Sequence, residues 1–198
     1  TVDDKGNVDY MIYGYSKAKE HVGENGISIL RYNYESNSSK EAAFVPCKVP
    51  AYNLEKQLSQ LCYVGDGTLY IMMNNTIYYA NLKTKEWGAL VENVEDGSFT
   101  TCFAINSDGS MLAYNTSGKA YDTENITIVN LKNGEKKTIE AGADNIITVY
   151  GYTGTNLIYG IGSQSDVSKE SFVPVSKLVI VDKDYKEVKS YSQNKIYI

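Results

Sequence analysis

Short apolar runs separated by turn signals recur along the chain, and the pattern is clearest between residues 99 and 139. The turns are marked by Asn106-Ser-Asp-Gly109 and Lys132-Asn-Gly134, which combine residues that favour tight reversals. Four strands joined by such turns over about forty residues match the size of one propeller blade. The pattern predicts strands at 100–105, 110–114, 126–131 and 135–139.

The same order of runs and turns repeats on both sides of this segment. Asp66-Gly67 precedes Asp108-Gly109 by 42 residues, and Gly154 follows Gly109 by 45, which is a propeller spacing. The first copy lacks an innermost strand and keeps only Phe44 and Val45 of a third one. We therefore predict an all-β fold, a β-propeller of about four four-stranded antiparallel blades that is complete or partial. The predicted single domain spans 1–198, with blades at 1–46, 61–95, 99–141 and 146–192 and a closing strand at 195–198.

The predicted closing strand, 195–198, has two interpretations. It pairs beside the strand at 8–15 and closes the ring, or it begins a blade that truncation has removed. One segment departs from the strand pattern: Leu54, Leu58 and Leu61 share a helical face after Asn53, a residue suited to a helix cap. We expect one short helix between blades, near 53–61.

The apolar strand runs also predict the core. The residues expected to be buried are Met11, Ile12, Ile29, Leu69, Ile71, Ile77, Leu82, Phe103, Ile105, Leu112, Ile128, Leu131, Leu157, Ile158, Val179 and Val181.

Charge and composition narrow the range of partners. The chain has a net charge of −5, and Arg31 is its single arginine, so it has no basic stripe for nucleic acid. No run is as long as a membrane helix, so we expect no direct membrane insertion by this fragment. The start at Thr1 without methionine suggests an excised fragment whose signal or anchor has been removed.

The three cysteines are an odd number without metal-ligand spacing, and His21 is the only histidine to join them. We expect Cys62 and Cys102 to act as small buried hydrophobes in comparable strands, and a disulfide between them is the alternative. We expect no metal site, no cofactor and no catalytic residue.

Long polar loops are the best candidates for binding, because loops on a rigid sheet commonly carry function. In the predicted blades these loops are 16–26, 117–125 and 163–176, and all fall at corresponding places on one face. The reachable polar groups that we predict for ligand binding are Glu20, His21, Tyr121, Asp122, Asp166 and Glu170.

Two polar clusters have both a chemical interpretation and a purely structural one. Glu20-His21-Val-Gly-Glu24 invites an acid–base or metal role, against a solvated loop. Asp3, Asp4, Asn7 and Asp9 offer oxygen ligands for calcium, but the distal glutamate of the calcium loop is missing and the segment occupies a turn. The chain has no sequence motif for a nucleophile activated by a histidine base. A pair of carboxylates that cleaves glycosides remains an alternative.

The stretch Asp108-Gly-Ser-Met-Leu-Ala-Tyr114, followed by Ile126-Thr-Ile-Val-Asn-Leu-Lys-Asn-Gly134, resembles the blade repeat of TolB-like and WD40-like β-propellers. With its four copies, the chain also resembles the propeller domain of uncharacterised bacterial envelope proteins. This resemblance implies an extracytoplasmic or cell-surface location. The leading hypothesis is a non-catalytic binding or scaffold module for a protein, peptide or glycan. The alternatives are a hydrolytic, carbohydrate-active propeller using loop carboxylates, and a gating or anchoring domain of a larger protein.

Overall fold

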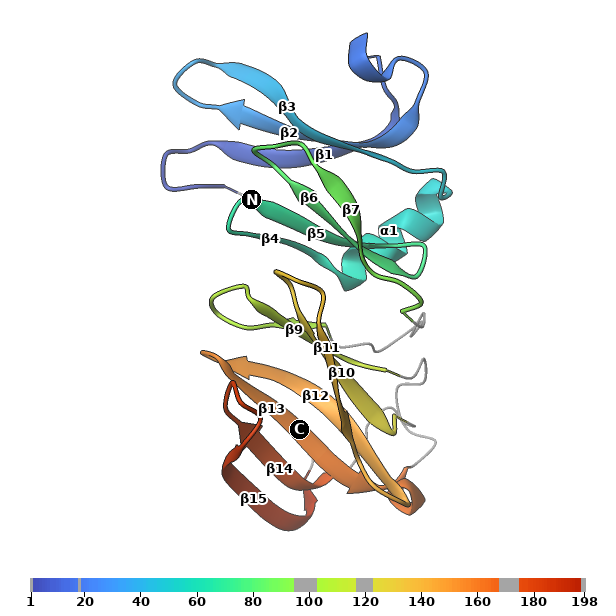
Figure 1. The fold of residues 1–198 in the computed structure, drawn as a ribbon, viewed down its shortest axis with the longest axis vertical. Helices are drawn as coiled ribbons and strands as arrows, with labels where there is room; N and C mark the ends of the chain where they lie inside the picture. The colour runs from blue at the N-terminus through green and yellow to red at the C-terminus, as the bar shows by residue number, and fades with distance from the viewer. Residues whose placement is uncertain (1, 18, 95–102, 117–122, 168–174, 197–198) are drawn as a thin grey trace. The chain divides into compact units, whose positions relative to one another are not determined.

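The computed structural model describes residues 2–17, 19–94, 103–116, 123–167 and 175–196 (Figure 1). These residues form antiparallel sheets with one α-helix and two short 3-10 helices. The chain divides into two compact units, Thr1–Glu92 and Asn93–Ile198, which are described separately below.

The first unit contains two sheets joined by the helix. The N-terminal sheet has the order β1-β2-β3, and its strands are β1 (Val8–Tyr15), β2 (Asn25–Asn33) and β3 (Ser38–Pro46). After α1 (Ala51–Gln60) the second sheet follows as β4 (Cys62–Gly65), β5 (Thr68–Met73), β6 (Thr76–Asn81) and β7 (Trp87–Val91). Inward side chains of both sheets share one core with Leu54 of the helix, which includes Ile29, Val45 and Ile71.

The second unit also contains two sheets, and each of them has four strands. One consists of β8 (Ala104–Ile105), β9 (Met111–Asn115), β10 (Asn125–Asn130) and β11 (Lys136–Glu140). The other consists of β12 (Asn145–Thr153), β13 (Asn156–Ser163), β14 (Val175–Val181) and β15 (Glu187–Ile196). Ile126, Ile128, Ile147 and Leu157 lie at most 1% exposed in the core that both sheets share.

Each sheet is an up-and-down meander in which consecutive strands pair, as in the blades of a propeller. The predicted fold class is confirmed: the chain is all-β, with blade-like antiparallel sheets and one short helix between the first two. The first sheet has three strands in the described residues, in agreement with the missing inner strand.

The predicted core is largely correct. The buried members are Ile29, Leu69, Ile71, Ile77, Leu112, Ile128, Leu131, Leu157, Val179 and Val181. Five more are half-buried: Met11, Leu82, Phe103, Ile105 and Ile158. The prediction for Ile12 is wrong, because this residue is 55% exposed. Side chains alternate along β1, and Met11 and Tyr13 take the face that packs on the core, so Ile12 points the other way.

Several element boundaries differ from the prediction. β8 spans Ala104–Ile105, where the sequence predicted 100–105, and residues 100–102 lie outside the described residues. β3 extends over nine residues, whereas the sequence indicated only Phe44 and Val45, because Ser, Lys and Glu occupy its first half. The helix begins at Ala51 with Pro50 at the cap position, so Asn53 is not its cap. Pro50 suits this place, because its φ is preset and the missing N–H is one that no helical carbonyl would accept.

Cys62 is exposed, contrary to the expected buried position, because it begins β4, one of the two edge strands of its sheet. Cys102 and its proposed pairing lie outside the described residues. Lys195 and Ile196 continue β15, where Ile196 pairs with Val175. Residues 197 and 198 lie outside the described residues, and the pairing of 195–198 with β1 stays a prediction.

Candidate functional site

The loop between β1 and β2 is the longest connection in the first sheet, and it folds onto itself. The backbone N–H of Ser16 donates to the carbonyl of Glu24 at 2.8 Å, and the N–H of Gly23 donates back to Ser16 at 3.1 Å. The 3-10 helix η1 (Lys19–His21) lies inside this closed base. The loop therefore presents Glu20 and His21 from a hydrogen-bonded frame rather than from a free chain.

The ring of His21 lies flat on the ring of Phe44 in β3, with centroids 4.2 Å apart and an interplanar angle of 15°. Ala43 and Val45 face the core, so Phe44 is on the opposite face of β3 and yet is only 5% exposed. Gly26 makes room for it, since a Cβ there would lie 2.5 Å from Phe44 Cζ and 2.6 Å from the Val45 carbonyl oxygen. The sheet thus holds the imidazole through Phe44.

Carboxylates surround this imidazole on both of its nitrogen sides. Nδ1 of His21 lies 3.7 Å from Glu24, and Nε2 lies 3.8 Å from Glu41 of β3. Glu20 joins Glu41 and His21 in a cluster whose ligand atoms lie within 4.8 Å of one another. Lys85, from the turn between β6 and β7, reaches Glu20 at 3.8 Å. We call Glu20, His21, Glu24 and Glu41 the His21 cluster.

A second feature of the first unit is a hollow of about 350 Å³ where β3 ends and α1 begins. We call it the α1 hollow. Its walls come from the connection 46–50, one face of α1, and the β5–β6 turn. The lining residues are Pro46, Cys47, Lys48, Val49, Pro50, Asn53, Gln57, Met73, Asn74 and Tyr78.

Hydrogen bonds hold the walls of the α1 hollow in place. The Tyr13 hydroxyl donates to the carbonyl oxygen of Val49, and the side-chain amide of Asn25 donates to that hydroxyl at 3.0 Å. On the other side, Gln57 Oε1 accepts the backbone N–H of Asn74 at 2.7 Å, which ties the helix to the turn. Asn74 and Asn75 both have positive φ, as a two-residue hairpin turn of this kind needs.

The thiol in the α1 hollow is not poised as a nucleophile. Burial raises the pKa of Cys47, and the backbone N–H of Val49, 3.4 Å from Sγ, offsets this only in part. Because the thiolate is the reactive form, a raised pKa keeps this sulfur protonated near neutral pH.

The second unit has an acidic hollow of about 360 Å³, which includes parts of two of the predicted binding loops. Glu124, Asn125 and Gln164 come from those loops and line it together with Glu140 and Asp144. Asp166 lies exposed in the 3-10 helix η2 (Gln164–Asp166) and does not line it. Tyr121, Asp122 and Glu170 lie outside the described residues.

Of the six predicted site residues, Glu20 and His21 lie in one cluster. Their neighbours Glu41 and Lys85 were not predicted from the sequence. Glu41 and Lys85 are 20 and 64 residues from His21 along the chain. Strand pairing in the first sheet brings Glu41 to the loop, whereas Lys85 comes from a turn of the second sheet. The α1 hollow was also missed. Its one sequence signal is the polar face of the predicted helix, next to the Pro46-to-Pro50 break.

No protein-family model matches this chain, and no curated protein does either. Solved structures do resemble it, at low sequence identity. The chain is similar to dipeptidyl peptidase 4 of Porphyromonas gingivalis, with a TM-score of 0.51 and 10% identity over 98% of this chain and 32% of that one.

Two further structures are similar to a lesser degree. The β-propeller domain of the Trilobed protease from Pyrococcus furiosus, described as having an open velcro topology, gives a TM-score of 0.46 and 13% identity, over 99% of this chain and 56% of that one. TolB from Acinetobacter baumannii gives a TM-score of 0.41 and 11% identity, over 91% of this chain and 48% of that one. The chain thus spans between about a third and about half of these proteins. The predicted resemblance to TolB-like propellers is confirmed at the level of the fold.

Proposed function

We propose that this chain is a non-catalytic binding module that takes a peptide or glycan segment of a partner at the α1 hollow. The observation that carries this proposal is the composition of the hollow, which joins an aromatic ring, three side-chain amides and two prolines. Binding sites are commonly concave, with apolar walls and a few placed polar groups that fix the orientation of the ligand.

The groups of the α1 hollow match a neutral or weakly anionic polar ligand. Asn53, Gln57 and Asn74 each carry an amide that both donates and accepts, as a peptide bond or a sugar hydroxyl requires. Tyr78 offers a ring with a polar end, and Lys48 is the one charged residue in the lining. Because hydrogen bonds already hold the walls of the hollow in place, binding a ligand there costs little conformational entropy.

Presentation outside the cytoplasm is part of the proposal and rests on the resemblance to envelope propellers. In the part of the chain that the structure describes, no helix is long and apolar enough to cross a membrane. Localisation of a tagged full-length protein by cell fractionation tests this part, and retention in the cytoplasm would contradict it.

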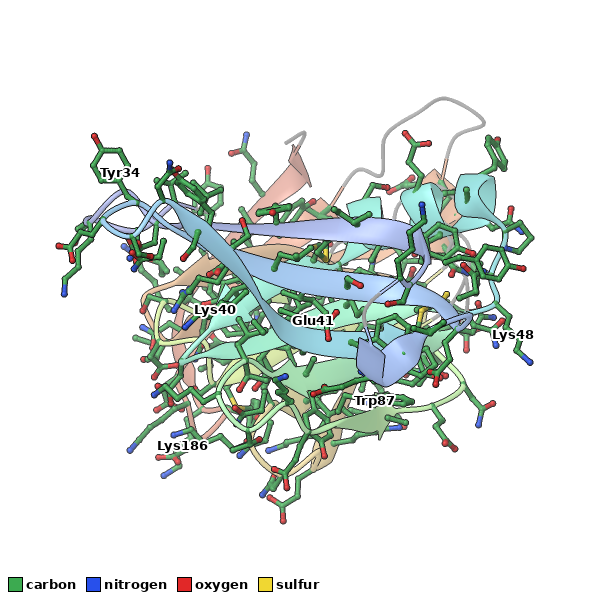
Figure 2. The ribbon with its side chains drawn as sticks, turned by 90° about the horizontal axis from the view of Figure 1, so that it is seen from above. Tyr34, Lys40, Glu41, Lys48, Trp87 and Lys186 are labelled. Carbon is green, nitrogen blue, oxygen red and sulfur yellow. The ribbon has the colours of Figure 1, made fainter. Side chains whose placement is uncertain are left out.

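Calorimetry against panels of oligosaccharides and extended peptides tests the binding role. Lys48→Ala and Asn53→Ala are expected to weaken the best ligand of the panel several-fold each. Lys40→Ala is the matched control, since Lys40 is also exposed and lies on the other side of the view in Figure 2. Equal losses in Lys40→Ala and Lys48→Ala, or hydrolysis of panel members by the wild type, would contradict the proposal.

A second candidate is a gating or anchoring domain of a larger protein. The observation in its favour is that the chain matches 32% of the length of the similar peptidase chain. The full-length gene decides this: a fused catalytic domain would support the gating role, and its absence would leave the binding module alone.

A further inference from the structure

The His21 cluster combines donor types that a divalent transition metal prefers. One imidazole and two carboxylates, from Glu20, His21 and Glu41, lie within 4.8 Å of one another. Imidazole nitrogen and carboxylate oxygen are both common zinc ligands, and three protein ligands leave a fourth position open to water or substrate. This cluster is separate from the α1 hollow, so the inference is independent of the proposed function.

Two of the three donors are already held in place. His21 is stacked on the buried ring of Phe44, and Glu41 projects from β3 with only 18% of its side chain exposed. Figure 2 shows Glu41 on β3, away from both ends of the strand. Glu20 is the adaptable donor, because its side chain is 73% exposed on η1. A site with two fixed donors and one mobile donor can close on an ion.

The fourth member of the cluster lies where a metal-binding histidine usually has a partner. Metal-ligating histidines almost always donate their other ring N–H to a carboxylate, a carbonyl or water, which fixes the tautomer. Here Nε2 faces Glu41 while Nδ1 faces Glu24 at 3.7 Å. This distance is longer than an N–H···O bond of about 2.7–3.2 Å, so the loop must tighten slightly when the ion binds.

Lys85 lies beside Glu20, the exposed member of the cluster. Its ammonium group lies 3.8 Å from Glu20 and neutralises one of the three carboxylates near His21. Donor atoms of a tetrahedral zinc site are about 3.3 Å apart, given zinc bond lengths of about 2.0–2.1 Å. Glu20 therefore has to leave Lys85 and swing inward, and Lys85 competes with the metal.

We propose that Glu20, His21 and Glu41 bind a divalent transition metal ion, with Zn²⁺ as the probe and Glu24 as the positioning residue for His21. The site joins the β1–β2 loop to β3, so the bound ion fixes the loop on the sheet. An ion that binds only the folded state also stabilises it.

Titration of the chelator-treated, untagged chain with Zn²⁺ tests this site by calorimetry. We expect one ion per chain, with affinity reduced at least tenfold in both His21→Gln and Glu41→Gln. Lys85→Gln is expected to raise the affinity several-fold, because it removes the competing cation. Glu35→Gln is the matched control, since Glu35 is an exposed glutamate in the turn between β2 and β3 of the same sheet. Unchanged affinity in His21→Gln and Glu41→Gln would overturn the proposal.

A spectroscopic readout separates ligation from a change in folding. His21 is the only histidine in the chain, so its imidazole nitrogen resonances are assigned without ambiguity. Zn²⁺ is expected to shift the Nε2 resonance strongly and to keep Nδ1 protonated. A titration that leaves both ring nitrogens unmoved while the fold is intact would also overturn the site.

Discussion

At the scale of single residues, Gly26 is a position where close packing leaves no room for a side chain. A Cβ at this site would meet both a side-chain atom and a backbone oxygen at 2.6 Å or less. Gly26→Ala is expected to destabilise the first unit by about 1–3 kcal/mol through overpacking, measured by urea unfolding. Gly88→Ala is the control, because the three atoms nearest to its added Cβ all belong to the Tyr79 side chain, at 3.2 Å or more. Equal costs at both positions would contradict this explanation.

Asp108 gives a residue-scale prediction about acid stability. Hydrogen bonds from the side chain and backbone of Ser110 lower the pKa of this carboxyl. Its contribution to stability is therefore present above the unfolded pKa, near about 4, and is lost as the pH falls through the lower folded value. Asp108→Asn is expected to lower stability at pH 7 and to flatten the acid dependence, measured by thermal melts from pH 7 to 2. Asp66→Asn, in the corresponding turn of the second sheet, is the control; an unchanged acid slope in Asp108→Asn would contradict the assignment.

At the scale of elements, Asn115 joins two sheets of the second unit. It lies 4% exposed at the end of β9, and its Oδ1 accepts the backbone N–H of Val149 in β12 at 2.9 Å. Asn115→Ala leaves that buried N–H without a partner, at a cost of about 1–3 kcal/mol. Hydrogen exchange should show faster exchange at Val149 first. Asn133→Ala, in an exposed turn, is expected to cost much less, and equal costs would contradict the link.

The elements also show how far sequence reasoning reaches. Alternating patterns and turn signals predicted the strands, and leucines on one helical face predicted the helix, because these are local properties. β3 was underestimated, because its exposed first half carries Ser, Lys and Glu. The candidate site was predicted only in part: Glu20 and His21 belong to one loop, but Glu41 reaches them through the β2–β3 register, which carries a bulge between Ile29 and Leu30. The register in which β2 and β3 pair cannot be predicted from the amino-acid composition.

At the scale of the whole molecule, ring closure by residues 195–198 stays a prediction. We expect a monomer by light scattering, with protected amides in β1. Deleting 195–198 also removes the pairing of Ile196 with Val175. Faster exchange in β14 is therefore expected with or without ring closure. Faster exchange in β1 would report closure. Unchanged exchange in β1, or self-association of the intact chain, would contradict it.

The most direct test of the binding role is an NMR titration of the ¹⁵N-labelled chain with the best ligand of the oligosaccharide and peptide panels. The account predicts amide shifts at Cys47, Lys48, Val49, Asn53 and Asn74, around the α1 hollow. Shifts confined to the second unit, or no shift with any panel member at millimolar concentration, would contradict it.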